Sequence, residues 1–253
     1  MLLTACGATV TPPSPVVLKA AGSTSMGPLL TDLETAYSTQ HPHVTFDIQG
    51  GGSQLGQTLV EAGQVNLGLV SWSPQNLTRS LRSIPIAHDA IAVILHPRNK
   101  IDGLSLVELR DIFNGRLLNW QEVAGPAQPI QVVSREDSSG TRAAFEAIVM
   151  DQQPVTPTAI VLPNSPAVVD FVAQNPNAIA YVSLAFTKNG VYVVPIEGIL
   201  PTLESLASGS YLLTRDLFIL VPKQGQPELD QFVEFVLSPA GQAIVASKWG
   251  RVR

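Results

Sequence analysis

Apolar and polar positions along the chain follow strand and helix periods in turn. An apolar run over residues 16–21 predicts a strand, and apolar residues three or four apart over 26–37 predict a helix that ends before Pro42. Further strands are expected at 44–48, 67–70, 90–96, 130–133, 179–182, 191–195 and 213–221, the last interrupted at 214–216, and further helices at 53–62, 105–113, 141–150, 164–172, 227–236 and 239–249. This alternation predicts an α/β fold with one largely parallel sheet or two of them.

Glycine and hydroxyl residues follow the ends of four predicted strands. They occupy residues 21–25, 50–53, 71–73 and 138–141. In an α/β sheet the carboxyl ends of parallel strands lie at one edge, where ligands bind. One serine-rich turn would mean little, but four at the same structural position predict a shared polar site.

The stretch 130–150 carries the most chemistry. Arg135 follows a predicted strand, and hydroxyls crowd the expected start of the next helix at residues 138–141. A helix start exposes unpaired N–H groups and the positive end of the helix dipole. Together with hydroxyl donors and a guanidinium, it would bind an oxyanion. An ordinary capped helix after a loop is the alternative that this stretch alone leaves open.

Composition narrows the function further. The 253 residues are 45% hydrophobic and 14% charged, which is typical of a globular protein, and the net charge of -5 argues against a nucleic-acid partner. Leu55 breaks the G-x-S-x-G pattern of a nucleophile elbow, and the glycines at 50–52 are followed by no P-loop lysine. His88 and His96 lack a partner at metal-ligand spacing. We therefore expect no catalytic residue, metal site or cofactor.

The single cysteine has an informative context. Residues 3–7 (Leu-Thr-Ala-Cys-Gly) are similar to a bacterial lipobox, in which Cys6 would receive the lipid; a chance cysteine is the alternative. The segment before Cys6 is too short for a complete signal peptide. We interpret residues 1–16 as a signal remnant and an extended tether. A lipid-anchored domain outside the cytoplasmic membrane is the expected localisation.

Several segments together resemble the phosphate-binding proteins of bacterial phosphate ABC importers, the PstS family. The matching segments are Ala-Gly-Ser-Thr-Ser at 21–25, Gln-Gly-Gly-Gly-Ser at 49–53, Asn-Leu-Gly-Leu-Val-Ser at 66–71, Asp-Ala-Ile-Ala-Val-Ile-Leu-His-Pro at 89–97, Leu-Arg-Asp-Ile-Phe-Asn-Gly at 109–115, Ser-Arg-Glu-Asp-Ser-Ser-Gly-Thr-Arg at 134–142 and Tyr-Leu-Leu-Thr-Arg at 211–215. The resemblance runs from about residue 17 to the end, and the order and spacing of the segments make it specific.

The resemblance implies a two-lobe type II periplasmic-binding-protein fold with a central cleft and two hinge crossings. Lobe one would comprise residues 17–97 and 215–253, and lobe two residues 98–214. The crossings would lie near residues 96–98 and 212–216.

The resemblance also implies which residues contact phosphate. The positions that match the family's contacts, with their immediate neighbours, are Thr24, Ser25, Ser53, Ser71, Arg135, Ser138, Ser139, Gly140 and Thr141. Many family members have an aspartate at the position of Ser71, which accepts the proton of hydrogen phosphate. Asp137 is the nearest replacement in sequence and Asp89 a weaker one, although Asp137 could instead orient Arg135.

The implied function is a monomeric receptor that captures inorganic phosphate and delivers it to the membrane permease of an ABC importer. Because sulfate carries no proton near neutral pH, a carboxylate acceptor rejects it. Serine at 71 therefore leaves another tetrahedral oxyanion, such as sulfate, molybdate or tungstate, as an alternative. A phosphate-sensing lipoprotein with the same fold is a second alternative.

Overall fold

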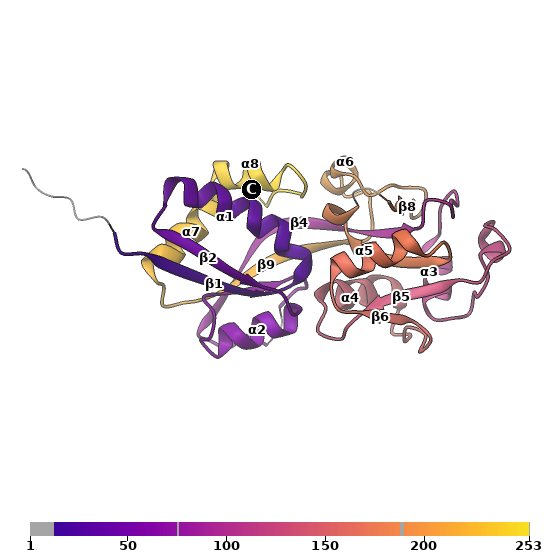
Figure 1. Cartoon of the computed structure of the whole chain (residues 1–253), viewed down its shortest axis with the longest axis horizontal. Coiled ribbons are helices and arrows are strands. Elements are labelled where there is room, and N and C mark those ends of the chain that lie inside the picture. The colour runs from indigo at the N-terminus through magenta and orange to yellow at the C-terminus, as the bar shows by residue number, and fades with distance from the viewer. Residues whose placement is uncertain (1–12, 75, 188–189, 253) are drawn as a thin grey trace, which may run out of the picture.

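The computed structural model describes residues 13–74, 76–187 and 190–252. Figure 1 shows two lobes side by side, and two long strands, β4 (Leu81–Leu95) and β9 (Thr214–Pro222), run between them. The expected two-lobe α/β fold is confirmed.

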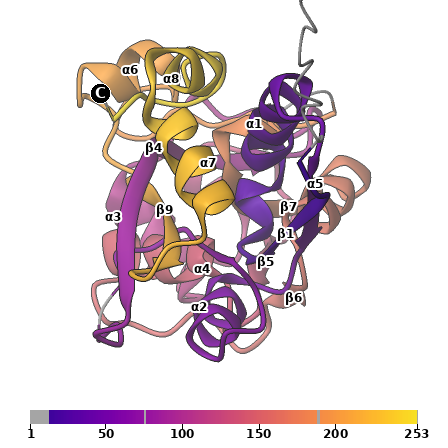
Figure 2. The same cartoon turned by 90° about the vertical axis from the view of Figure 1, so that its left-hand side faces the viewer.

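Lobe one is a sheet with helices on both faces. Its strands are β1 (Val16–Gly22), β2 (Val44–Gln49) and β3 (Leu67–Val70), and its helices are α1 (Gly27–Gln40), α2 (Ser53–Glu61), α7 (Pro227–Leu237) and α8 (Pro239–Val245). Figures 1 and 2 show α1 and α7 on one face of these strands and α2 on the other. Buried residues of α1, α7 and α8 form one core with the sheet, and Val60 of α2 belongs to a second, smaller one.

Lobe two repeats this layered arrangement. Its strands are β5 (Gln131–Arg135), β6 (Ile160–Leu162), β7 (Ala178–Ser183) and β8 (Tyr192–Val193), and its helices are α3 (Leu106–Phe113), α4 (Gly140–Phe145), α5 (Ser165–Gln174) and α6 (Leu203–Ala207). A π-helical turn over Glu146–Met150 continues α4. One core lies against α3 and α4, and another lies under α5. Neither β6 nor α6 was expected from the sequence pattern, because each is only a few residues long.

The strands form one continuous mixed sheet of nine strands, in the order β2-β1-β3-β9-β4-β7-β5-β6, with β8 also paired to β4. In lobe one, β1 pairs in parallel with β2 and β3. In lobe two, β5 pairs in parallel with β6 and β7. All pairs that involve β4 or β9 are antiparallel. The expectation of a largely parallel sheet therefore holds for β1–β3 and for β5–β7, while β4 and β9 add antiparallel pairs to both lobes.

The chain crosses from lobe one to lobe two in the middle of β4. Residues up to Ala90 pair with β9, and Ile91 onwards pair with β7 of lobe two. This places the first crossing before the expected stretch 96–98. The return crossing lies between Leu213, in the core of lobe two, and Leu217, in the core of lobe one.

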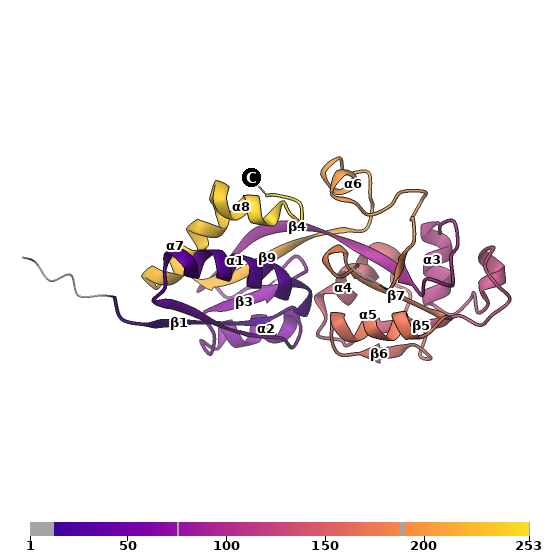
Figure 3. The same ribbon diagram turned by 45° about the horizontal axis from the view of Figure 1, so that its top comes forward.

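The crossing strand β4 is longer than its sequence pattern predicted, and the crossing strand β9 is more regular than its pattern predicted. The first half of β4 contains Pro85, where the register with β9 shifts, and a polar pair at 88–89 that hides the strand period. Residues 214–216 interrupt the apolar pattern of β9 but still pair regularly with β4. Figure 3 shows the two strands as the bridge between the lobes.

Candidate functional site

The polar ends of β1 and β3 and the start of α2 meet at the inner end of lobe one. A 3₁₀ turn over Thr24–Met26 follows β1, α2 begins at Ser53, and Ser71 directly follows β3. The Ser23 N–H donates to the Leu69 carbonyl at 2.9 Å, which brings the two strand ends together. The ends of β1 and β3 lie side by side. The hydroxyls that follow them therefore meet at one edge of the sheet, as the sequence pattern predicted.

Four buried serine hydroxyls form a chain at this edge. Ser25 and Ser23 are joined at 2.9 Å, Ser23 and Ser71 at 2.8 Å, and Ser71 and Ser53 at 3.2 Å. The Ser71 N–H also donates to the Ser53 hydroxyl at 3.1 Å. All four side chains are buried. Of the predicted residues, the structure therefore brings Ser25, Ser53 and Ser71 together, and it adds Ser23.

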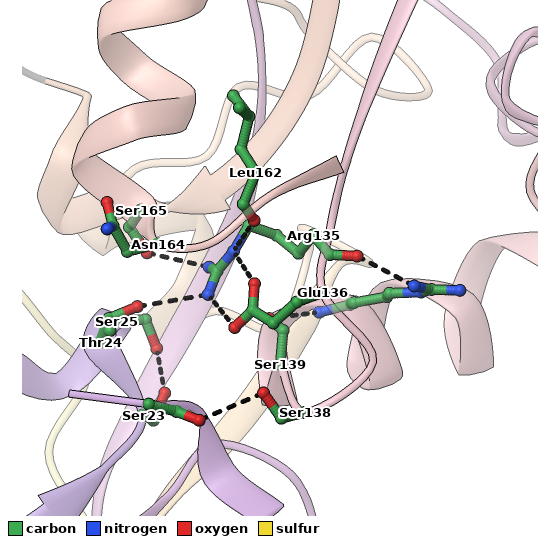
Figure 4. A network of polar contacts seen from close by, with 12 residues as sticks. Ser23, Thr24, Ser25, Arg135, Glu136, Ser138, Ser139, Leu162, Asn164 and Ser165 are labelled. Atoms are coloured by element: carbon green, nitrogen blue, oxygen red, sulfur yellow. Dashed lines mark hydrogen bonds and ion pairs between the residues drawn. The ribbon is translucent and has the colours of Figure 1, made fainter. Parts of the chain in front are cut away.

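Arg135 reaches the same place from lobe two. Its side chain is 2% exposed and donates through Nη2 to the Thr24 hydroxyl at 3.3 Å, across the boundary between the lobes. Nε and Nη2 also form a two-pronged pair with the Glu136 carboxylate, each at 2.8 Å, and Nη1 donates to the Ser165 hydroxyl at 3.3 Å. Figure 4 shows the guanidinium held among these partners. Its orientation is fixed by Glu136, which the sequence analysis had not singled out.

The start of α4 contributes the remaining predicted residues. Ser139 caps the helix, since its hydroxyl accepts from the Arg142 N–H at 3.2 Å. Gly140 lies so close to lobe one that a Cβ there would be 2.2 Å from the Ser53 hydroxyl and 2.4 Å from that of Ser71. The Thr141 hydroxyl is buried and has no hydrogen-bond partner among the described residues. Because a buried hydroxyl without a partner is costly, this hydroxyl is free to bond to a ligand at the start of α4.

Ser138 ties the two lobes together directly. Its hydroxyl donates to the Gly51 carbonyl at 3.2 Å, and its own carbonyl accepts from the Gln54 N–H at 3.3 Å. Backbone groups at the start of α2 and in the loop before α4 are therefore in contact. In this arrangement the lobes are closed over the buried hydroxyls.

Asp137 does not lie with these groups. Its side chain is 92% exposed and pairs with Arg142 at 2.5 Å. Its position does not support the expectation that it accepts the ligand's proton, because a solvated carboxylate on the outer side of the loop does not face the buried hydroxyls. It does not orient Arg135 either, since Glu136 does so.

The weaker candidate, Asp89, lies much closer to the site, paired with a residue that the sequence analysis did not select. Arg215 donates to one Asp89 oxygen through Nε at 3.0 Å and Nη2 at 2.8 Å, and Nη2 also donates to the Ser25 hydroxyl at 3.0 Å. The Ser183 hydroxyl donates to the other Asp89 oxygen at 2.8 Å. Burial raises the pKa of Asp89 and lowers the pKa of Arg215, while the attraction between them opposes both shifts.

The site as a whole is rich in hydrogen-bond donors. Two guanidiniums, a chain of hydroxyls and the start of α4 converge from the two lobes and from the crossing strands. Both nearby carboxylates, Glu136 and Asp89, are already engaged by an arginine. Such a donor set suits a small oxyanion, which accepts hydrogen bonds through all of its oxygens.

Comparisons with known proteins agree with this geometry. Residues 9–240 match the model of a PBP superfamily domain. The chain is 27% identical to the phosphate-binding protein PstS of Pseudomonas aeruginosa, over 90% of this chain and 80% of the relative.

Solved structures give the same result. A putative phosphate ABC transporter substrate-binding protein from Clostridium perfringens, with bound phosphate, superimposes with a TM-score of 0.91 at 32% identity, over 94% of this chain and all of the other. An ABC-type phosphate transport receptor from Vibrio cholerae gives a TM-score of 0.76 at 27% identity, over 92% and 99% of the two chains. The chain therefore belongs to the PBP superfamily and, within it, to the PstS family.

Proposed function

We propose that this chain binds inorganic phosphate between its two lobes and delivers it to the permease of an ABC importer. The observation that carries the proposal is the buried donor cluster between the lobes. Gly140 packs against it, and the neighbouring Thr141 hydroxyl is buried with no hydrogen-bond partner among the described residues. Thr24, Ser25, Ser53, Ser71, Arg135, Ser139, Gly140 and Thr141 are the proposed contacts, and Ser138 joins the lobes around them. The relatives are described as binding proteins and transport receptors, and we propose a monomeric binding protein rather than an enzyme.

Closure of the lobes explains how the chain would bind the ion and release it. In the closed arrangement the donors are out of water, where fixed dipoles and charges attract an anion more strongly than they do in solvent. The contacts from Thr24 to Arg135 and from Gly51 to Ser138 exist only when the lobes meet. Phosphate would therefore favour the closed state, because only that state presents both halves of the site. The closed form would then dock on the permease.

One observation favours a different ligand of the same shape. Ser71 stands where many family members have an aspartate, and Asp89 and Glu136 already accept from arginine. Without a free carboxylate, hydrogen phosphate and fully ionised sulfate would differ less in affinity. A receptor for another tetrahedral oxyanion is therefore the second candidate function.

Calorimetry with the purified chain separates the two candidates. We expect phosphate to bind at one ion per chain, and we expect an excess of sulfate to leave that affinity nearly unchanged. Phosphate binding that sulfate, molybdate or tungstate abolishes would assign the site to the other oxyanion. The absence of heat with all four ions would contradict the donor cluster as a binding site.

The lipid anchor rests on the sequence alone, because Cys6 lies outside the described residues. In the described ranges no helix has the length and apolarity to cross a membrane. We propose that Cys6 carries the lipid that holds the chain outside the cytoplasmic membrane. A Cys6→Ser variant, expressed with a complete signal peptide, is expected to appear in the soluble fraction of cells. Continued sedimentation with membranes would show that another feature anchors the chain.

A further inference from the structure

We propose that Arg215, from the crossing strand β9, is a positioning residue that directs the hydroxyl protons of the serine chain toward the bound anion. The inference rests on the proposed function, because it concerns the same anion site. Arg215 is 7% exposed and meets the site at one end of the serine chain, through its bond to Ser25. Its Nη1 also donates to the Ser71 carbonyl at 3.5 Å, so the guanidinium contacts both the residues that follow β1 and the residue that follows β3.

The hydrogen bonds of the serine chain can be counted. Four hydroxyls supply four protons, and the three bonds between them use three of these protons. At the Ser25 end the incoming donor is Arg215, and at the Ser53 end it is the Ser71 N–H. Among the described residues no acceptor takes the fourth proton. Whichever way the chain is oriented, one buried hydroxyl proton is left over for an external acceptor such as an anion.

Arg215 preserves this surplus because it can only donate. A guanidinium has no acceptor atom and stays charged in proteins, so the Ser25 hydroxyl must accept from it. Hydrogen-bonded hydroxyls polarise one another, and a charged donor at one end strengthens each onward bond. A group with an acceptor oxygen at the same place would take up the surplus proton, and the anion would lose a donor.

Asp89 holds Arg215 in this orientation. The two residues are cross-strand partners in β4 and β9, and the same carboxylate also accepts from Ser183 of lobe two. The Asp89 carboxylate lies at the junction of the lobes and therefore fixes the orientation of the Arg215 guanidinium there. The neighbouring cross-strand pair, His88 and Asp216, is nearly half exposed, with its atoms 2.6 Å apart. Because successive residues of a strand point to opposite faces, this second pair lies away from the serine chain and gives a matched control.

The test is a double-mutant cycle on the full chain, read by phosphate calorimetry. Asp89→Asn with Arg215→Gln removes both charges, so no unpaired buried charge is left, and the glutamine supplies an acceptor. We expect this double variant to bind phosphate about tenfold more weakly. In a Ser25→Ala background, where the link to Arg215 is already broken, we expect the same two changes to weaken binding less than about threefold.

Two further variants make the result specific. Arg215→Lys keeps a charged group that only donates, and it is expected to bind more tightly than Arg215→Gln. Asp216→Asn is expected to bind phosphate as the wild type does. Melting temperatures show that each variant is folded.

Two results would overturn the role of Arg215. One is a loss of affinity in the Ser25→Ala background as large as the loss in the wild-type background, and the other is wild-type affinity in the double variant. A wild-type chain that binds no phosphate would instead contradict the proposed function, so the two failures are distinguishable.

Discussion

Arg135→Ala is expected to lower the affinity for phosphate by roughly 30- to 4000-fold, because truncating one partner of a buried charged contact costs about 2–5 kcal/mol. Arg135 supplies a buried guanidinium that reaches Thr24 of lobe one from lobe two. Its Nη1 carries two hydrogens and donates to a single described partner, Ser165, so a donor is left for the ligand. Calorimetric titration with phosphate measures the loss.

The effect should be specific to this arginine. Arg116 also lies in lobe two and pairs with Asp111, but its side chain is 67% exposed. Arg116→Ala is therefore expected to leave the phosphate affinity unchanged, since surface ion pairs contribute little. Arg135→Lys should recover only part of the loss, because a lysine cannot reproduce the two-pronged pair with Glu136. Wild-type affinity in Arg135→Ala would remove Arg135 from the site.

The hydroxyls of the site could be predicted from sequence because they are local features of strand ends. Ser25, Ser53 and Ser71 each follow a strand or begin a helix, and one sheet edge brings such positions together. The Thr141 hydroxyl was predicted from the same kind of pattern at the start of α4. The positions of strand ends and helix starts along the sequence therefore indicated which hydroxyls are buried at this edge of the sheet.

The partners of the two arginines could not be predicted in this way. Asp89 and Arg215 are 126 residues apart and meet only through the antiparallel pairing of β4 and β9. The sequence pattern gave no sign of that pairing, because Pro85 and residues 214–216 hide the strand period. Glu136 was missed for a different reason: two adjacent carboxylates follow Arg135, and only the fold decides which one turns inward.

The same limit applies to the fold. The core-facing periods of the helices and the central strands were read correctly, since burial imposes them directly. The junction of the lobes is different, because its two strands leave one core and enter another within a few residues. Ala90 and Leu217 belong to different cores although both lie near a crossing. A pattern averaged over a whole strand cannot locate such a change.

Gly140→Ala is expected to weaken phosphate binding by roughly 5- to 140-fold while leaving the fold intact. A Cβ at this position would lie within 2.5 Å of the hydroxyls of Ser53 and Ser71, both buried in the opposite lobe. Overfilling a packed contact of this kind costs about 1–3 kcal/mol, which corresponds to that range. The clash exists only when the lobes meet, so it should act on closure rather than on either lobe alone.

The folding stability of the variant separates this explanation from general damage. Gly140 opens α4, where alanine is a better helix former than glycine, so the melting temperature without ligand is expected to stay the same or rise. Small-angle scattering with saturating phosphate should show a more open shape than the wild type. Gly27→Ala is the matched control, because Gly27 also begins a helix and a Cβ there would meet nothing within 4 Å. Unchanged affinity in Gly140→Ala would mean that the lobes do not approach this closely around the bound ion.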